Sequence, residues 1–347
     1  MLRKDYLKLP LKERFLELSK SEDEHATELH EKLISVDIHS HIIRNFDRQR
    51  VKNSSVTCFF EAVAVVDEIF EESMKKLGFA LHFIQLQPDM DLGFCAEDIR
   101  DAKVTGKQVV MMQLEPQTVG LQLDRVDALY GLGVRMMLLT YNSRNYIGDG
   151  CGERTNSGLS CYGLQVVERM NKVGMLIDLS HCGDRTTSEA IEASKDPVLI
   201  SHSGARALNP QCMRLRTDEH IEAVAEKDGL IGISAAPNQL SSSNRQGIQD
   251  LLNHVDYVVK LAGINHVAIG LDNELNIDAY YQEATQEGKF RLPAVGQGKN
   301  AEYMEGIESP EEWPNITRGL VSRGYSDQEI EKIIGGNALR IIGSIIG

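Results

Sequence analysis

Short apolar runs alternate with helical patterns along most of this 347-residue chain, and this alternation constrains the fold more than any other feature. Eight runs are predicted as strands because they are short, apolar and bounded by polar residues or glycine. They cover residues 35–41, 79–84, 108–115, 134–141, 175–181, 197–202, 230–235 and 266–272. A strand followed by a helix, repeated eight times, is the pattern of an α/β protein of the (β/α)8 TIM-type barrel class.

The predicted helices support the same architecture. Helical spacing of apolar residues lies between the strands, for example over residues 121–132, 164–172, 184–194, 218–227 and 248–261. Glycines stand near several of the helix ends, as in a C-cap: Gly133, Gly174, Gly229 and Gly263. A doubly wound open sheet would give a similar string, but its G-x-G-x-x-G turn is missing after the first strand. We therefore predict a single barrel domain over residues 1–347.

Segments at both ends extend the predicted barrel. Residues 1–34 are assigned to a leader, whose periodic part, 11–34, is predicted as an amphipathic helix. Helices are also predicted over residues 315–323 and 326–342, and Ser326 with Glu329 forms a capping box for the second. The polar stretch 273–314 is too long for an ordinary connection, so it is interpreted either as an active-site lid or as a surface excursion.

Charge and cysteine usage narrow the class of protein. The chain has 37 Lys and Arg against 51 Asp and Glu, and the net charge of −14 argues against nucleic acid or an anionic membrane as partner. No run of about 18 apolar residues is present, so no membrane span is expected. The six cysteines form no C-x-x-C pair, so a zinc ribbon is not expected. Because no apolar signal segment follows Met1, we expect a cytoplasmic protein.

Four of the ten histidines stand at the carboxyl ends of predicted strands. His39 and His41 close the first strand, and because strand side chains alternate, both point to one side and can share a metal ion. The carboxyl ends of barrel strands converge on one face of the fold. The histidines and carboxylates that this face would gather are His39, His41, Glu115, His181, His202 and Asp272.

These residue types together predict a metal centre. Imidazole and carboxylate groups are the ligands of zinc and similar divalent ions. Four histidines and a bridging Glu115 can hold two ions, which suits hydrolysis, and Asp272 is then free to act as general base and acid. A single strand-end histidine is as often a structural residue as a ligand, so the prediction depends on the joint pattern.

Other polar residues receive simpler interpretations. Histidines on polar or mixed helical stretches are predicted to lie at the surface: His25, His30, His220 and His254. Asp37 precedes His39 by two residues, and it is expected either to orient that histidine or to face water at the start of the strand.

Two stretches carry a family resemblance. Residues 170–182 read M-N-K-V-G-M-L-I-D-L-S-H-C, and residues 201–207 read S-H-S-G-A-R-A. Both resemble the membrane dipeptidase (renal dipeptidase) family of the amidohydrolase superfamily. Residues 315–327 and 335–340 are also similar to that family, and the resemblance extends over residues 35–342, less clearly over 42–105 and 273–305.

The resemblance implies a barrel with two zinc ions that cleaves small peptides. Tolerance of a D-residue at the C-terminal position is a further expectation for such a dipeptidase. It places His39 and His41 on the first ion, His181 and His202 on the second, and Glu115 between them. By the same resemblance, Asp272 would move the proton. Arg214 matches the arginine that grips the C-terminal carboxylate of the substrate, a task that suits a planar guanidinium; Arg216 is a close rival. Many family members are dimers, so a homodimer is an implied possibility.

Three departures from the family pattern bear on the substrate. The second residue of the H-x-D pair is His41 here, which removes one negative charge. Tyr141 replaces the family histidine expected to stabilise the oxyanion, and it can donate one hydrogen bond but carry no positive charge. Residues 270–275 read G-L-D-N-E-L in place of G-x-D-F-D-G.

The prediction is therefore zinc-dependent hydrolysis of dipeptides, small-molecule substrates, by a metal-bound hydroxide. An amidohydrolase acting on N-acyl amino acids or lactams is the first alternative, and a non-catalytic ligand-binding barrel is the second.

Overall fold

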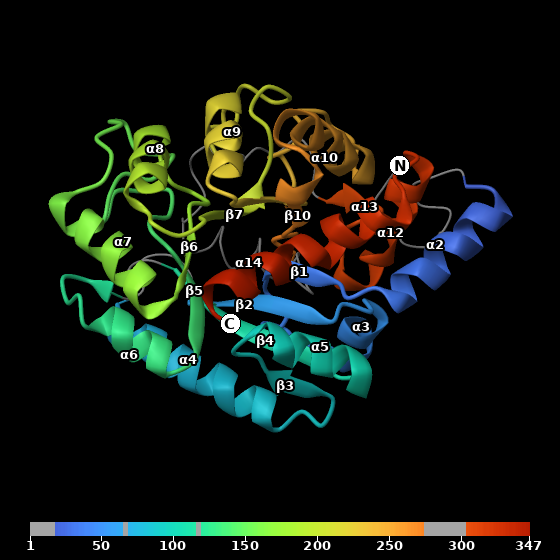
Figure 1. The fold of residues 1–347 in the computed structure, drawn as a ribbon, viewed down its shortest axis with the longest axis horizontal. Helices are drawn as coiled ribbons and strands as arrows, with labels where there is room; N and C mark the ends of the chain where they lie inside the picture. Colours follow the sequence, from blue (N-terminus) through green and yellow to red (C-terminus); the bar gives the residue numbers. More distant parts are fainter. Residues whose placement is uncertain (1–17, 65–68, 116–118, 274–302) are drawn as a thin grey trace.

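The computed structural model describes residues 18–64, 69–115, 119–273 and 303–347 of the chain (Figure 1). The start of the predicted leader and residues 274–302 of the predicted lid lie outside these described residues.

Eight parallel strands close into a barrel, as the alternating pattern predicts. Each strand pairs with its neighbours in the order β2-β1-β10-β8-β7-β6-β5-β4, and a β2–β4 pairing completes the ring. The barrel strands are β1 (Val36–Ser40), β2 (Cys58–Ala64), β4 (Gln108–Leu114), β5 (Val134–Leu138), β6 (Leu176–Asp178), β7 (Leu199–Ser203), β8 (Leu230–Ile233) and β10 (Val267–Ile269). Three shorter strands lie outside the ring: β3 (Met90–Leu92), which pairs with the first half of β4, and the mutual pair β9 (Gln246–Gly247) and β11 (Met304–Glu305).

One predicted strand is wrong. Residues 79–84 belong to helix α4 (Phe70–Gln85), which buries Leu77, Ala80 and Ile84 at helical spacing. The second barrel strand is instead β2, whose apolar run is interrupted by Glu61. The Glu61 side chain is buried, and it accepts hydrogen bonds from the backbone N–H groups of Ile42 and Ile43 at 2.7 and 3.1 Å. A polar residue that binds backbone in this way breaks an apolar run without breaking the strand.

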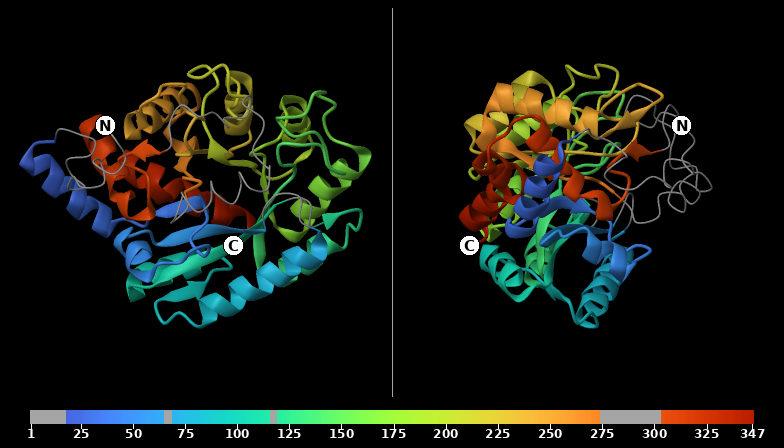
Figure 2. Two further views of the ribbon diagram at one scale, coloured as in Figure 1. Left: turned by 180° about the vertical axis from the view of Figure 1, so that it is seen from behind. Right: turned by 90° about the vertical axis from the view of Figure 1, so that its right-hand side faces the viewer.

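Helices surround the barrel and extend it at both ends (Figures 1 and 2). Those between strands are α3 (Arg48–Asn53), α4, α5 (Ala96–Thr105), α6 (Arg125–Gly131), α7 (Cys161–Val173), α8 (Asp184–Ala193), α9 (Asp218–Glu226) and α10 (Ile248–Ala262). The predicted N-terminal helix is α2 (Lys20–Lys32), which packs on α12 (Pro314–Ser322). The C-terminal helices continue with α13 (Asp327–Glu331), a π-helical turn (Lys332–Gly336) and α14 (Asn337–Ile345), and the Ser326–Glu329 capping box is present.

The barrel interior is filled below the strand ends that carry the histidines. Every barrel strand contributes a buried residue to one apolar cluster: Ile38, Phe60, Met111, Met136, Leu176, Leu199, Leu230 and Ala268. Ala338 and Ile341 of α14 join this cluster, so α14 covers the amino ends of the strands. The opposite, carboxyl ends are therefore the open face of the barrel.

Asp37 connects β1 to the last strand of the barrel. It accepts hydrogen bonds from the backbone N–H groups of His39 at 3.3 Å and Leu271 at 3.0 Å, and from the Trp313 indole at 3.2 Å. Burial raises the pKa of this carboxyl to about 7. Asp37 therefore neither faces water nor holds the His39 ring, which corrects both interpretations from the sequence.

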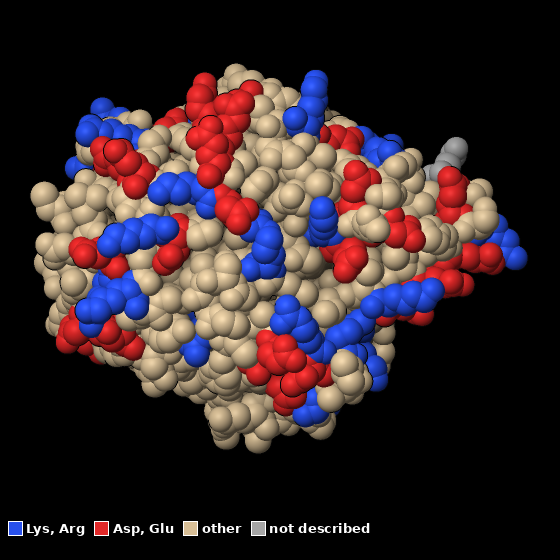
Figure 3. All heavy atoms as spheres, viewed as in Figure 1, with Lys and Arg blue, Asp and Glu red and all other residues tan. Residues whose placement is uncertain are grey.

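The face shown in Figure 3 carries acidic and basic side chains side by side, without a continuous basic patch. This mixture agrees with the net charge of −14.

Candidate metal centre

The four strand-end histidines meet at the open face of the barrel. His39 and His41 come from the end of β1, His181 follows β6, and His202 lies in β7. The rings of His39 and His202 stack with centroids 3.6 Å apart, and those of His181 and His202 lie 5.1 Å apart. All four side chains are buried. The convergence expected from the sequence is therefore present in the fold.

His181 and His202 form the first half of the centre. Their Nε2 atoms are 3.1 Å apart. The Nδ1 atom of His181 is 2.8 Å from Asn142 Oδ1, and that of His202 is 2.7 Å from Ser201 Oγ. Burial lowers the pKa of both rings well below the usual value, so both are neutral. With the protons on Nδ1, two nitrogen lone pairs face each other, which is the donor arrangement that a divalent cation fits.

His39 and His41 form the second half, together with Asp272. The Asp272 Oδ1 atom lies 3.6 Å from His39 Nε2 and 3.3 Å from His41 Nε2. The His39 Nδ1 atom is 2.9 Å from Gln113 Oε1, which leaves Nε2 toward the carboxylate. Burial raises the pKa of Asp272, but the facing imidazoles of His39 and His41 outweigh burial and hold it well below the usual range. These three residues place one ligand atom each within 4.8 Å of one another.

Two residues of the centre have unusual backbone conformations. His181 has φ of 64° and Asp272 has φ of 58°, values in the left-handed region that non-glycine residues rarely adopt. Each costs on the order of 1 kcal/mol or more, and such strain clusters at functional sites.

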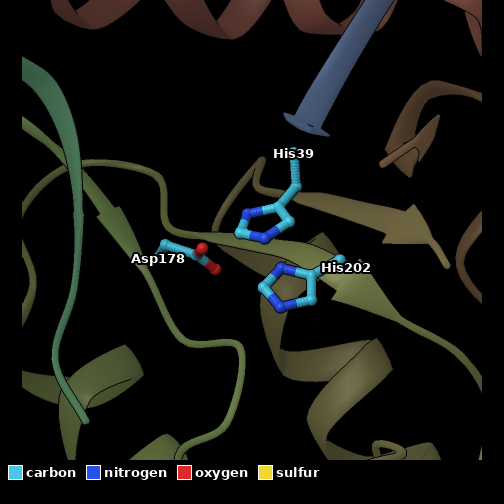
Figure 4. A group of neighbouring side chains, drawn as sticks. All are labelled: His39, Asp178 and His202. Carbon is cyan, nitrogen blue, oxygen red and sulfur yellow. The ribbon is translucent and has the colours of Figure 1, made fainter. Parts of the chain in front are cut away.

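Asp178 makes a third close group with His39 and His202 (Figure 4). Its Oδ1 accepts from the N–H groups of Ser180 and Ser201, both at 2.9 Å. Its Oδ2 accepts from Gln113 Nε2 at 3.0 Å and from the Ser201 hydroxyl. Because donors of the protein occupy both oxygens, Asp178 fits the role of a support better than that of a ligand.

Tyr141 and Glu115 border the centre. The Tyr141 ring stacks on His181 with centroids 3.9 Å apart. Burial, and then the charges of Glu115 and Asp272, raise the pKa of Tyr141 well above its usual value, so the phenol keeps its proton and stays a hydrogen-bond donor. Glu115 is buried directly after β4. Gly150 lets the following loop pack closely, because a Cβ atom there would lie 1.9 Å from the Tyr141 carbonyl oxygen.

The two candidate arginines differ in their contacts. Arg216 donates to the Cys182 carbonyl at 2.7 Å, the Thr187 hydroxyl at 2.8 Å and the Arg214 carbonyl at 2.9 Å. Arg214 donates from Nη2 to the His202 carbonyl at 3.4 Å, while its buried Nη1 has no hydrogen-bond partner among the described residues. The charge of Arg214 also lowers the pKa of His181, after burial. Arg216 also has one buried nitrogen, Nε, without a partner among the described residues, but both of its terminal nitrogens are bonded. Arg214 is therefore the arginine with a terminal nitrogen that lacks a partner among those residues.

Four supporting residues were not singled out by the sequence reasoning: Gln113, Asn142, Asp178 and Ser201. A positional signal existed, because each lies within three residues of a predicted site residue. That signal does not identify a hydrogen-bond partner, which only the fold supplies.

Comparisons with known proteins show a family and a fold. A model of the membrane dipeptidase family, peptidase family M19, matches residues 14–283. An uncharacterized dipeptidase of Schizosaccharomyces pombe is 28% identical over 262 residues, 72% of this chain and 57% of the relative. The crystal structure of an amidohydrolase from Pseudomonas aeruginosa is 27% identical with a TM-score of 0.83, covering 93% of this chain and 99% of that one.

A further solved structure shares the fold. It is a metallo peptidase from Rhodobacter sphaeroides, liganded with a phosphinate mimic of the dipeptide L-Ala-D-Ala. It is 18% identical with a TM-score of 0.75 and covers 91% of this chain and 99% of that one. This chain spans 46% to 61% of the length of the curated relatives it matches. Among the helices that the structure describes, none is both long and apolar enough to cross a membrane.

Proposed function

Because this chain belongs to the membrane dipeptidase family, peptidase family M19, we propose that it is a metal-dependent dipeptidase. Membership of a metallopeptidase family implies a divalent metal ion. The number of ions, their identity as zinc and the roles of the residues below belong to this proposal.

The observation that carries the proposal is the pair of imidazoles on His181 and His202, whose Nε2 atoms face each other at 3.1 Å. These two residues would hold one zinc ion, His39 and His41 the other, and Glu115 would touch both. When bound, the ions polarise the scissile carbonyl and lower the pKa of a water molecule. The replacement of a family aspartate by His41 keeps a ligand in place but leaves the centre with one negative charge fewer.

Asp272 would move the proton. Its low pKa means that it is ionised before the reaction and can accept a proton from the attacking water. The same oxygen can return that proton to the leaving amine as the peptide bond breaks. The Asp272 Oδ1 atom, 3.6 Å from His39 Nε2 and 3.3 Å from His41 Nε2, would remain next to that half of the centre during both transfers.

Tyr141 and Arg214 would determine how the substrate is held. The protonated phenol of Tyr141 would donate to the oxygen that becomes negative in the transition state. Arg214 would bind the free carboxylate of the substrate with its Nη1 donor. Because Arg214 donates a hydrogen bond to the His202 carbonyl, the site for the substrate carboxylate would lie at a fixed distance from the zinc ligands. Only a short substrate satisfies both ends, which favours dipeptides.

A second function keeps the same centre and changes the substrate. Tyr141 cannot supply the positive charge of the family histidine, so a more reactive or differently shaped amide, an N-acyl amino acid or a lactam, is the alternative.

The experiment is a substrate panel with protein stripped of metal and reloaded with zinc. It contains L,L and L,D dipeptides, N-acyl amino acids and a lactam; the mimic bound by the Rhodobacter sphaeroides peptidase is the reason to include L,D dipeptides. We expect dipeptide cleavage that depends on zinc and is lost in Asp272→Asn. Cleavage of only the N-acyl amino acids or the lactam would select the second function. A protein with two bound zinc ions that cleaves nothing in the panel would contradict both.

A further inference from the structure

Asp178 receives four hydrogen bonds in a buried position beside the stacked rings of two histidines, His39 and His202 (Figure 4). The two bonds to Oδ1 come from backbone N–H groups, which can only donate. They hold one oxygen toward the backbone and aim the other, Oδ2, at Gln113 and Ser201. An ionised carboxylate only accepts, so the two groups facing Oδ2 must both donate to it.

This requirement orients Gln113. Its side chain lies between Asp178 Oδ2, 3.0 Å from its Nε2, and His39 Nδ1, 2.9 Å from its Oε1. Because the amide nitrogen has to face the carboxylate, the amide oxygen has to face His39. An amide oxygen accepts, so the His39 proton must sit on Nδ1 and its Nε2 must carry a lone pair.

The same requirement orients Ser201. Its single hydroxyl proton goes to Asp178, so its oxygen can only accept from His202 Nδ1 at 2.7 Å. The His202 proton is therefore also on Nδ1. The backbone of the neighbouring strands packs closely on Ser201, because a Cβ atom on Gly232 or Gly270 would lie 1.9 or 2.0 Å from the Ser201 carbonyl oxygen.

We propose that Asp178 is a positioning residue that fixes the tautomer of His39 and His202 together, one histidine in each half of the metal centre. The proposal rests on the proposed function in that these Nε2 atoms are taken as metal ligands. It assigns to one buried carboxylate the task of presenting a lone pair to both ions. His181 is the internal reference, because its Nδ1 faces Asn142 instead.

The test is Asp178→Asn. The two backbone N–H groups keep the new side-chain oxygen at the Oδ1 position, so the new NH2 group replaces Oδ2. It donates where the carboxylate accepted, so Gln113 turns its oxygen toward position 178 and Ser201 becomes free to donate to His202. Both histidines then carry the proton on Nε2, and the affinity for each of two zinc ions falls by about 10–100-fold.

Two measurements follow this change. Imidazole nitrogen NMR of the metal-free variant reads the tautomers directly, and we expect His39 and His202 to switch while His181 does not. Competition with a chelator reads the zinc affinity. Circular dichroism of the metal-free protein checks that the variant is folded. A loss of affinity with both tautomers unchanged would overturn the proposal, because a purely structural defect has that signature.

A double variant separates the effect of Asp178 on His39, through Gln113, from its effect on His202, through Ser201. In Asp178→Asn with Gln113→Glu, the introduced carboxylate accepts from the new amide and from His39 Nδ1. The His39 tautomer should therefore return while the His202 tautomer stays switched. Ser201→Ala removes the hydroxyl alone and should change the tautomer of His202 but not that of His39. This variant keeps the proposal testable if Asp178→Asn does not fold. Unchanged tautomers in both variants would refute it.

The tautomers are measured without metal or substrate, so the outcome is independent of the dipeptidase assay. Switched tautomers in a protein that cleaves no dipeptide would support the role of Asp178 while contradicting the proposed function.

Discussion

Buried histidines occupy two regions of the described residues, the open face of the barrel and the surrounding helices. His202 at the open face and His254 in α10 are equally buried, at 1% exposure. His254 accepts from the Ala205 N–H at 2.9 Å and donates to the Leu240 carbonyl at 2.9 Å, so backbone uses both of its nitrogens. In His202 only Nδ1 has such a structural partner, the Ser201 hydroxyl, and Nε2 faces another histidine.

The difference shows that burial does not distinguish a candidate ligand from a structural histidine. In the helices, His30 and His220 also pair with hydroxyl groups, those of Thr317 and Ser188. At the open face, one ring nitrogen of His39, His181 and His202 lies beside a side-chain oxygen, and the other points to a second imidazole or to Asp272. What identifies a candidate ligand is the group that its second nitrogen faces.

The largest effect should come from a pair of variants with one histidine removed in each region, His202→Ala and His254→Ala. His202→Ala should lower the dipeptidase activity to that of the metal-free protein, and it should lower the number of zinc ions bound per chain by one. His254→Ala should keep zinc and activity but lower the free energy of unfolding by about 3 kcal/mol, because two backbone groups lose their partner. Metal analysis and denaturant titration measure the two outcomes. Zinc loss in His254→Ala would break the comparison.

Tyr141→Phe should have the next largest effect. Removal of the one donor aimed at the oxyanion should lower kcat by about 10²–10³-fold with little change in KM. Tyr146→Phe, in the same loop but exposed, is the matched control and should leave kcat unchanged. A kcat within threefold of the parent for Tyr141→Phe would show that Tyr141 does not stabilise the oxyanion.

The two arginines should separate binding from folding. Arg214→Met should lower kcat/KM for dipeptides by about 10–100-fold, since a charged hydrogen bond is lost, but not for dipeptide amides, which lack the carboxylate. Arg216→Met should lower the thermal midpoint, because its carbonyl and hydroxyl partners are buried. The reverse assignment of the two phenotypes would make Arg216 the substrate arginine.

Histidines in the helices also impose a pH dependence on the stability of the protein. Burial lowers the pKa of His30 and of His220 to about 4. Between that value and about 6.5, the unfolded chain binds a proton that the folded chain does not. The free energy of unfolding should therefore fall as pH decreases through this window, by about 1.4 kcal/mol per unit for each ring.

Denaturant titration of the metal-free protein from pH 7 to pH 4 measures this slope. His30→Gln should reduce the slope by the contribution of about one bound proton. His25→Gln, at an exposed histidine, is the matched control and should leave the slope unchanged. An identical slope in His30→Gln would show that this ring is not neutral in the folded chain.

Much of the barrel could be predicted because strands buried on both faces appear as apolar runs. The predicted strands from residue 108 onward all overlap observed ones. The second strand could not be found, because Glu61 interrupts β2 while the apolar face of α4 resembles a strand over residues 79–84. Local pattern cannot show that a buried glutamate has backbone partners from another segment.

The candidate site could be predicted to the level of strand ends. That level suffices to gather His39, His181 and His202, since the barrel geometry brings the ends together. It does not reveal Asp178 as a shared support or decide between Arg214 and Arg216, because those distinctions depend on hydrogen bonds between distant segments.

The expected surface histidines were the clearest error. His30, His220 and His254 lie on helices with many polar residues, but each is buried against a neighbouring element. A mixed helical pattern does not show which polar residue lies under a second layer. His25, the fourth of this group, is exposed as predicted.

The hydrogen bonds that Asp37 accepts from Leu271 and Trp313 also set an order of events during synthesis. Asp37 leaves the ribosome 234 residues before Leu271 and 276 residues before Trp313, the two distant donors it needs. Until β10 has emerged, β1 lacks the neighbour that closes the ring, and closing so long a loop is a late step. His39 and Asp272 meet at that same step. Under the proposed function, a nascent chain would first present the His39–His41 pair and then the His181–His202 pair, and the centre would be complete only after Asp272 has emerged.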